Sequence, residues 1–436
     1  MCEVCDSDLL GGAPQIYGDG QLYGDESDVL THDDRLSRRS ALKLGVGTLS
    51  LVGLSSLLPA TRAAASERAG FSALGPSAVP GAVPISMAMH VHSSFSEREG
   101  SMESQLAEAA ANSVDVLWWT EHDWRMAYTC YRTQVSFDSL AGELQFGAPW
   151  RWTPTTSGTP SATGGGIVST PVSPGDPSPI GALEVSLQQL TASDAAHGYW
   201  ADTSPSRNNQ CGNINGLGFA IDVYPGAVQG GGFLEVLVGL SRHPSTVANL
   251  DGTYSISYRF GPTGATTIGG QAPGSYVTTG RVGIVTQSLP ADTYTSVTLD
   301  LAADAASLWP RLDGRDNALV QLYLRAGSIG PGSALGYFDN LRLAWPSVNA
   351  AQATQAALMA EYAPRFPTVQ QFATQEISYH DARHFNVIGG DVPIDTNPGA
   401  TVVLAPAATT AWFQSCLLYT SPSPRDRQKS RMPSSA

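Results

Sequence analysis

Charged residues are scarce in this sequence, and positively charged ones are scarcer still. Only 14% of the 436 residues are charged, and 24 Lys and Arg face 38 Asp and Glu, which gives a formal net charge of −14 at pH 7. A protein that binds a nucleic-acid backbone needs clustered Lys and Arg. The composition therefore argues against a nucleic-acid partner.

The apolar run near the N-terminus is short. It covers Leu44–Leu58, fewer than the roughly 20 residues that a helix needs to span a bilayer. Arg38 and Arg39 precede it, and Ala63–Ala65 supply the small residues of a cleavage site. The pattern resembles a twin-arginine export signal. We expect residues 1–65 to direct export by the twin-arginine translocase to the periplasm or beyond, with no membrane anchor after cleavage; an uncleaved anchor is the alternative.

Cysteine is sparse once the two ends are set aside. Cys2 and Cys5 precede the signal, and Cys416 lies in a C-terminal tail, so only Cys130 and Cys211 remain. Outside the cytoplasm these two either form a disulfide or stay as separate thiols. We find no convincing catalytic triad built on Ser or Cys.

The tail itself, residues 416–436, resembles a translated sequencing adapter. CLLYTS matches one frame of a transposase mosaic end, and PSPRD continues it in frame. Such a segment is excluded from fold reasoning. We expect the natural protein to continue differently beyond Gln414 or Ser415; a natural Ser/Pro-rich tail is the alternative.

Glycine and proline are plentiful, at 45 and 29 residues, which is typical of strands joined by turns. A linker is predicted over residues 66–84, and the first part of an α/β domain over residues 85–143. A predicted strand over Val83–His92 spans the boundary between them. A helix over Ser101–Ser113 with Ser101 as its N-cap follows, and then a strand over Val114–Trp124. Strand, helix and strand in this order predict a β-α-β unit with parallel strands.

Residues 144–346 are strand-like, with frequent turn signals. The candidate strands are 183–190, 217–224, 233–241, 253–260, 280–289, 293–301, 317–326 and 336–344. Their spacing predicts an antiparallel β-sandwich of jelly-roll type, with residues 153–179 as a low-complexity loop. The α/β rhythm resumes over residues 347–415, with a helix at Val348–Ala363 and strands at Thr368–Tyr379 and His384–Asp391. We therefore expect one α/β domain interrupted by an inserted sandwich.

Three clusters of histidines and carboxylates follow or end the predicted parallel strands. They are His90, His92 and Glu97; Glu121, His122 and Asp123; and Glu376, His380 and His384. Functional groups collect at the carboxyl ends of parallel strands, and alternation puts His90 and His92 on one face. Mixed His and carboxylate ligands suit Zn²⁺, Mn²⁺ or Fe. The pattern therefore predicts a metal site, against the alternative of ordinary surface or core histidines.

The segments MHVHSSFSEREG, TEHDW and QEISYHDARHFNVIG resemble the first three motifs of the PHP domain, named for polymerase and histidinol phosphatase. The resemblance covers about residues 85–125 and 350–400. It implies a distorted β/α barrel, two or three divalent metal ions (Zn, Mn or Fe), and hydrolysis of a phosphoester by metal-activated water.

Carried over by position, the resemblance makes His90, His92, Glu97, His122, Glu376 and His384 metal ligands. It gives supporting catalytic roles to Glu121 and Asp123, although Asp123 alternatively only packs or caps a turn. Glu stands where the family has Asp at both 97 and 121, and the later motifs have no counterpart. We therefore expect a truncated barrel with an incomplete metal centre, so that this chain can lack activity.

The segment YFDNLRLA, with Asp339 and Asn340, resembles the ending of carbohydrate-binding jelly rolls. Three tryptophans, Trp150, Trp152 and Trp200, are candidates for stacking on sugar rings; the alternative is that they are core or edge aromatics. The sequence thus predicts an exported metal-dependent phosphoesterase acting on a small phosphoester or glycan. The alternative is a carbohydrate-binding or surface-attachment protein on a degenerate PHP scaffold.

Overall fold

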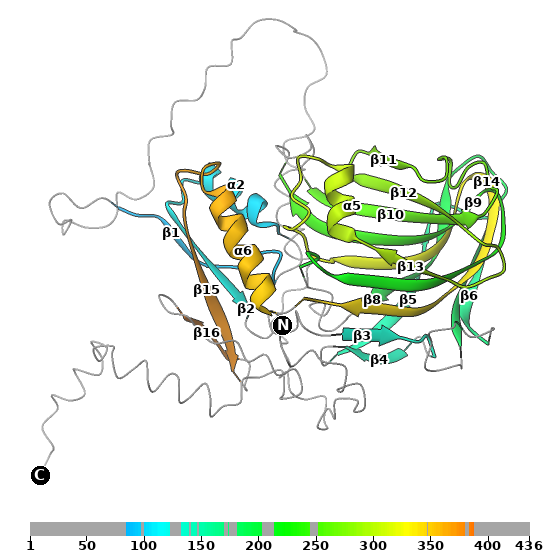
Figure 1. Cartoon of the computed structure of the whole chain (residues 1–436), viewed down its shortest axis with the longest axis horizontal. Coiled ribbons are helices and arrows are strands. Elements are labelled where there is room, and N and C mark those ends of the chain that lie inside the picture. The colour runs from blue at the N-terminus through cyan, green and yellow to red at the C-terminus, as the bar shows by residue number, and fades with distance from the viewer. Residues whose placement is uncertain are drawn as a thin grey trace, which may run out of the picture. The chain divides into compact units, whose positions relative to one another are not determined.

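A computed structural model describes part of the chain, which contains two β-sheets and three helices within the described residues. Figure 1 shows how these elements are arranged. The described residues are 84–96, 100–122, 132–138, 141–145, 148–169, 173, 181–202, 213–244, 252–346, 348–379 and 383–387. The export signal, the adapter-like tail, Cys130 and Cys211 lie outside them. Among the described residues, no helix is long and apolar enough to cross a membrane.

A four-stranded sheet carries the predicted histidine and carboxylate segments. Its order is β1-β2-β15-β16, formed by β1 (Met87–Val91), β2 (Val116–His122), β15 (Gln370–Tyr379) and β16 (Arg383–Val387). β1 and β15 each pair in parallel with β2, whereas β16 is antiparallel to β15. The parallel pairing of β1 and β2 confirms the predicted β-α-β unit.

Two helices, α2 (Met102–Ala111) and α6 (Val348–Tyr362), pack on one face of this sheet. Their core consists of Phe95, Met102, Leu106, Ala109, Leu117, Trp119, Ala351, Leu358, Tyr362 and Val369. The α2 sequence is rich in Ala and Glu, which favour helix. The Ser101 side chain accepts a hydrogen bond from the Ser104 N–H, so the predicted N-cap is confirmed.

A larger 12-stranded sheet contains the remaining strands. They are β3 (Arg132–Val135), β4 (Ala141–Gln145), β5 (Ala148–Ser157), β6 (Ala162–Val168), β7 (Ala182–Gln189), β8 (Ala195–Asp202), β9 (Gly218–His243), β10 (Gly252–Pro262), β11 (Tyr276–Thr279), β12 (Val282–Leu289), β13 (Thr295–Leu299) and β14 (Gln321–Ala344). Helix α5 (Leu301–Leu308) follows β13. Most neighbours are antiparallel, but β10 and β12 are parallel.

Two long strands, β9 and β14, join the layers of a β-sandwich (Figure 1). The first half of β9 pairs with β13 and the second half with β10, while the two halves of β14 pair with β8 and β7. Gly230 and Gly330 stand at the bend with φ of 60° and 65°, a region that other residues rarely adopt. Apolar side chains from both layers form one core, so the folded-over strands enclose it.

The predicted distorted β/α barrel is wrong. The described α/β part is a small sheet of four strands, and its last strand is antiparallel, so the alternation of parallel strands and helices does not continue. Strands of the sandwich dominate the described residues. The sequence pattern predicted the first β-α-β unit correctly, but the local order of strands and helices does not determine whether a sheet closes into a barrel.

The predicted low-complexity loop over residues 153–179 is also wrong in its first part. The second half of β5 and all of β6 lie there, in stretches rich in Thr and Gly. Both strands pair in register, β5 with β8 and β6 with β7. Small polar side chains suit the solvent-facing side of an outer strand, and low sequence complexity concealed this.

Candidate metal centre

The two histidines of the first motif sit at the end of β1. His90 belongs to the strand, and His92 is the first residue after it. The β1–β2 register shifts between Ala88 and Val91. Val91 packs against the helix-covered core, so alternation sends the histidine on either side of it to the other face. The His90 side chain is 50% exposed and the His92 side chain 17%.

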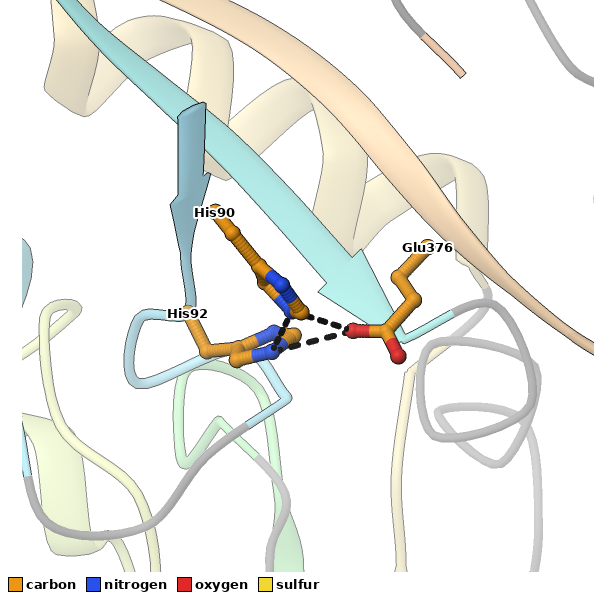
Figure 2. Close-up of side chains that lie close together, drawn as sticks. All are labelled: His90, His92 and Glu376. Atoms are coloured by element: carbon orange, nitrogen blue, oxygen red, sulfur yellow. Dashed lines mark hydrogen bonds and ion pairs between the residues drawn. The ribbon is translucent and has the colours of Figure 1, made fainter. Parts of the chain in front are cut away.

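Glu376 on β15 completes a compact cluster with these histidines. Its carboxylate oxygen Oε2 lies 2.7 Å from His90 Nε2 and 3.1 Å from His92 Nε2, and the two imidazole nitrogens are 2.9 Å apart. Figure 2 shows the three side chains pointing toward one another beside the end of β2. The Glu376 side chain is only 3% exposed, so this carboxylate is held at the inner edge of the cluster.

The donor set suits a divalent transition-metal ion. One ligand atom from each of His90, His92 and Glu376 lies within 4.8 Å of the others. In a tetrahedral site with metal–ligand bonds near 2.1 Å, ligand atoms are about 3.4 Å apart. The observed separations are a few tenths of an ångström shorter, so a small outward movement of side chains fits the ion. Two imidazoles and a carboxylate are typical ligands of Zn²⁺, Mn²⁺ or Fe.

Glu121 lies on the other face of β2, toward helix α6, and does not join the cluster. Its carboxylate accepts hydrogen bonds from the Ser93 N–H at 3.1 Å, the Ser93 hydroxyl at 2.5 Å and the Gln355 amide at 3.0 Å. The Ser96 hydroxyl donates to its second oxygen. Glu121 is 1% exposed. These contacts make Glu121 the anchor of the loop that follows His92.

Burial raises the pKa of Glu121 above its ordinary value of 4.5. Hydrogen bonds from Ser93 and Ser96, and the nearby His92, act in the opposite direction but do not outweigh burial. A carboxyl that is buried and fully hydrogen-bonded holds the backbone and does not reach a substrate. The predicted catalytic role of Glu121 therefore finds no support in this geometry.

The backbone of two further predicted ligands is close to Glu376. The Cα atoms of His122 and Glu376 are register partners between β2 and β15. The Cα atom of His384 pairs with that of Ser378 in the β15–β16 ladder. Glu97 and Asp123 lie outside the described residues. Strand register thus places His122 and His384 beside the cluster, and both stay predicted ligands.

The three candidate sugar-binding tryptophans have different surroundings. Trp152 is 3% exposed and belongs to the sandwich core, where its ring is 5.2 Å from that of Phe137. Trp150 lies in β5, and its side chain is outside the described residues. Trp200 is half-buried and stacks on Tyr323, with ring centroids 6.3 Å apart. Of the two whose side chains are described, only Trp200 is available to a ligand.

Trp200 and Tyr323 share the outer face of one sandwich layer. They are register partners between β8 and β14, and their neighbours Ala201, Leu322 and Leu324 are buried in the core. Further along the same face of β14, Arg325 forms an ion pair with Glu235 at 2.5 Å, and its guanidinium lies 5.4 Å from the Tyr323 ring centroid. The face thus combines aromatic rings with a charged pair.

The residues Asp339 and Asn340 of the YFDNLRLA segment are buried at an irregularity in β14. Asn340 has a φ of 48°, which Asn tolerates better than most residues, and its amide donates to Asp222 at 2.9 Å. Arg342 also contacts Asp222, at 2.9 Å. Asp339 and Asn340 therefore stabilise an irregularity in β14 and are not exposed to a ligand.

Sequence reasoning missed several residues of the site region. Ser93 and Ser96 were signalled by the SSFS segment directly after the histidines, because Ser side chains commonly hold nearby turns. Tyr323 alternates with core Leu residues in its strand, so period-two patterning marks it as outward-facing. Asp316, which hydrogen-bonds Ser94 from 222 residues away, carries no local signal.

Comparisons with known proteins give only distant structural likenesses. No protein-family model matches the chain, and no curated protein is significantly similar to it. A family 11 carbohydrate-binding module from Clostridium thermocellum, solved in complex with a β-1,3-1,4-mixed-linked tetrasaccharide, is 13% identical at a TM-score of 0.25, covering 49% of this chain and 96% of that one.

Two further likenesses are of the same kind. A family 30 carbohydrate-binding module of a cellulosomal cellulase of Clostridium thermocellum is 10% identical at a TM-score of 0.24, covering 49% of this chain and 98% of that one. The glycoside hydrolase domain of Endo-D from Streptococcus pneumoniae is 10% identical at 0.25, covering 49% of this chain and 27% of that one. Similarities this low assign neither a family nor a function to the chain.

Proposed function

We propose that this protein is a metal-dependent hydrolase whose centre is held by His90, His92 and Glu376. The observation that carries the proposal is the convergence of these three side chains, with the His90 and Glu376 atoms only 2.7 Å apart although the residues are 286 positions apart in sequence. One histidine would be enough to pair with an almost fully buried carboxylate; here two imidazoles converge on it with their nitrogens 2.9 Å apart, which is the arrangement expected around a metal ion. The resemblance of the same three segments to PHP motifs supports this choice.

The chain's own residues have defined parts in such a centre. His90, His92 and Glu376 would bind the ion, with His122 and His384 as further ligands, and the ion when bound would polarise the substrate and lower the pKa of a bound water. Glu376 contributes negative charge at the buried side, while the half-exposed His90 marks the side open to solvent. A substrate would therefore approach past His90.

A phosphoester is the proposed substrate class. The resemblance to the PHP motifs supports this substrate class. The lack of a convincing catalytic triad in the sequence agrees with it, because hydrolysis of a phosphoester by metal-activated water needs no Ser or Cys nucleophile. Export by the N-terminal twin-arginine pattern belongs to the same proposal. The twin-arginine translocase exports folded proteins, so the metal ion could bind inside the cell and leave with the protein. Metal binding inside the cell is therefore consistent with hydrolysis outside it.

The test is metal content and hydrolysis by the full chain. The protein is purified with Mn²⁺ or Zn²⁺, bound metal is measured by mass spectrometry, and p-nitrophenyl phosphate and bis-p-nitrophenyl phosphate serve as substrates. We expect metal and activity in the wild type, and loss of both in a His90→Ala, His92→Ala double variant. His197→Ala, a histidine on β8 of the sandwich, is the control. Absence of metal, or activity unchanged in the double variant, would contradict the proposal.

A second candidate function is carbohydrate binding by the sandwich. The observation that favours it is the stacked Trp200–Tyr323 pair on the outer face, with Arg325 and Glu235 beside it. Aromatic rings offer flat apolar surfaces to the C–H face of a sugar, and the partly exposed Arg325 guanidinium beside them can donate hydrogen bonds to its hydroxyls. The two functions are compatible, because a sandwich can hold a polymer near a hydrolytic centre.

Affinity electrophoresis of the full chain tests the second candidate. The gel contains soluble mixed-linkage β-glucan, xyloglucan or xylan, and the metal-free protein is used so that hydrolysis does not interfere. Retarded migration in one of the three supports carbohydrate binding. Unretarded migration in every one of them speaks against it and leaves the metal-centre proposal untouched.

A further inference from the structure

The four residues that follow His92 are buried. Ser93, Ser94, Phe95 and Ser96 are each no more than 1% exposed. Phe95 packs in the core of the α/β part, whereas Ser93 and Ser96 bind Glu121 of β2. The remaining side chain, Ser94, points elsewhere: its hydroxyl donates to Asp316 at 2.9 Å.

Asp316 belongs to the segment between α5 and β14 of the sandwich, and it is fully buried. Its oxygen Oδ1 accepts from Ser94 and from the Met102 N–H at 2.8 Å. The other oxygen accepts from the Glu103 N–H at 2.9 Å and the Tyr362 hydroxyl at 3.1 Å. One carboxylate of the sandwich thus contacts the loop, the start of α2 and the end of α6.

Two of these contacts satisfy the free N–H groups in the first turn of α2, where negative charge is favourable. The same α2 terminus is tied to the sandwich a second time, because the Ser101 hydroxyl donates to the Arg242 carbonyl at 2.7 Å. Asn213, also of the sandwich, donates to the Ser94 hydroxyl at 3.3 Å. Contacts of the sandwich therefore surround Ser94, two positions after His92.

We infer that Asp316 is a positioning residue of the metal centre, and that the sandwich is part of the scaffold that holds His92. The inference rests on the proposed function. Glu121 fixes the loop from the α/β side and Asp316 fixes it from the sandwich side. Without the second anchor, the loop keeps its attachment to β2 and the packing of Phe95, but it loses the hydrogen-bonded link through Asp316 to the start of α2 and to Tyr362. The His92 imidazole then samples positions away from His90 and Glu376, and metal affinity falls.

Binding of Co²⁺ to the full chain tests the inference, because its visible absorption spectrum reports coordination geometry. Residual binding in the His90→Ala, His92→Ala double variant defines the background. We expect Ser94→Ala to raise the Co²⁺ dissociation constant about 3- to 10-fold and Asp316→Ala about 10- to 100-fold, the range for residues that orient metal ligands. The spectrum should change in both, and Asp316→Asn, which retains one acceptor oxygen, should fall between wild type and Asp316→Ala.

Asp313→Asn is the matched control. Asp313 lies in the same segment but pairs with Arg315 near the surface. The Asp313→Asn protein should therefore bind Co²⁺ with the affinity and spectrum of the wild type. Thermal unfolding without metal identifies a variant that fails to fold. If Asp316→Ala does not fold, Ser94→Ala tests the inference in its place, because it removes only the hydroxyl that bonds to Asp316. Wild-type affinity and spectrum in a folded Ser94→Ala or Asp316→Asn protein would overturn the inference while the centre stands. A wild type without specific Co²⁺ binding would overturn the proposed function as well.

Discussion

The Nε2 atom of His90 lies 2.7 Å from a carboxylate oxygen of Glu376, and β2 separates the strands that carry them. Glu376→Gln preserves the size of this side chain but removes its charge. We expect the protein to fold and its affinity for Zn²⁺ or Mn²⁺, measured by titration calorimetry, to fall more than about 10-fold, since a carboxylate ligand supplies charge that an amide lacks. Glu361→Gln, an exposed carboxylate on α6, should leave the affinity unchanged; equal affinities in both variants would argue against Glu376 as a ligand.

Glu121 should affect stability more than chemistry. Glu121→Leu leaves the buried donors of Ser93, Ser96 and Gln355 without an acceptor, and a single such group costs about 1–3 kcal/mol. We expect a loss of roughly 3 kcal/mol or more in the free energy of unfolding, measured in urea. Glu108→Leu, on the exposed side of α2, should change it by less than about 0.5 kcal/mol. A stable Glu121→Leu protein would leave Glu121 free for a catalytic role.

The Arg325–Glu235 ion pair predicts how the free energy of unfolding depends on pH. Burial alone raises the pKa of Glu235, but Arg325, Ser257 and Arg259 outweigh it, and the pKa lies below its ordinary 4.5. The ionised carboxyl therefore stabilises the wild type above about pH 4.5, and this stability is lost as the pH falls through the lowered pKa. The pair joins a 3% exposed carboxylate to an 18% exposed guanidinium.

Arg325→Gln leaves that carboxylate buried without its main partner, which costs about 3 kcal/mol at pH 7. Burial then raises the pKa of Glu235, so the deficit should shrink as the pH falls from 7 to 4. Urea unfolding at several pH values measures this. Arg315→Gln, whose partners Asp313 and Glu361 lie near the surface, should cost at most about 1 kcal/mol. A deficit for Arg325→Gln that is constant over this range would contradict the assignment.

Trp200 and Trp152 should respond differently to truncation. Trp200→Ala removes a half-buried ring from the outer face, so we expect retardation by a soluble polysaccharide to disappear with little change in the temperature of unfolding. Trp152→Ala opens a cavity in the core and should cost about 3–5 kcal/mol of stability. Circular dichroism and affinity electrophoresis measure the two effects. Loss of fold in Trp200→Ala, or unaltered retardation, would contradict a binding role for this ring.

Much of the local structure followed from the sequence. Strand-like stretches between turn signals predicted β7, β10 and β12 to within a few residues, and Ser101 before an Ala-rich stretch predicted the start of α2. The strand–helix–strand order predicted parallel pairing of β1 and β2. These features depend on residues close together in the chain, so short patterns are sufficient to specify them.

The candidate site was only partly predictable. The His-x-His spacing put both imidazoles on one face of a strand, and the third segment contained the carboxylate that meets them. The sequence did not distinguish Glu376, which meets the histidines, from Glu121, which faces the helices from the neighbouring strand. That difference depends on the face of the sheet to which each side chain points once β1, β2 and β15 are in register.

The sequence by itself determined where most strands and helices form and which segments carry the candidate metal-binding side chains, because backbone propensity and side-chain alternation act over a few residues. Only the tertiary structure decided that the described α/β sheet is a small one and not a barrel, that Trp152 is core while Trp200 is half-buried on the outer face, and that Asp316 reaches Ser94. Each of these depends on the packing of segments that are far apart in the chain, and that packing follows from burial and hydrogen bonding in the complete fold.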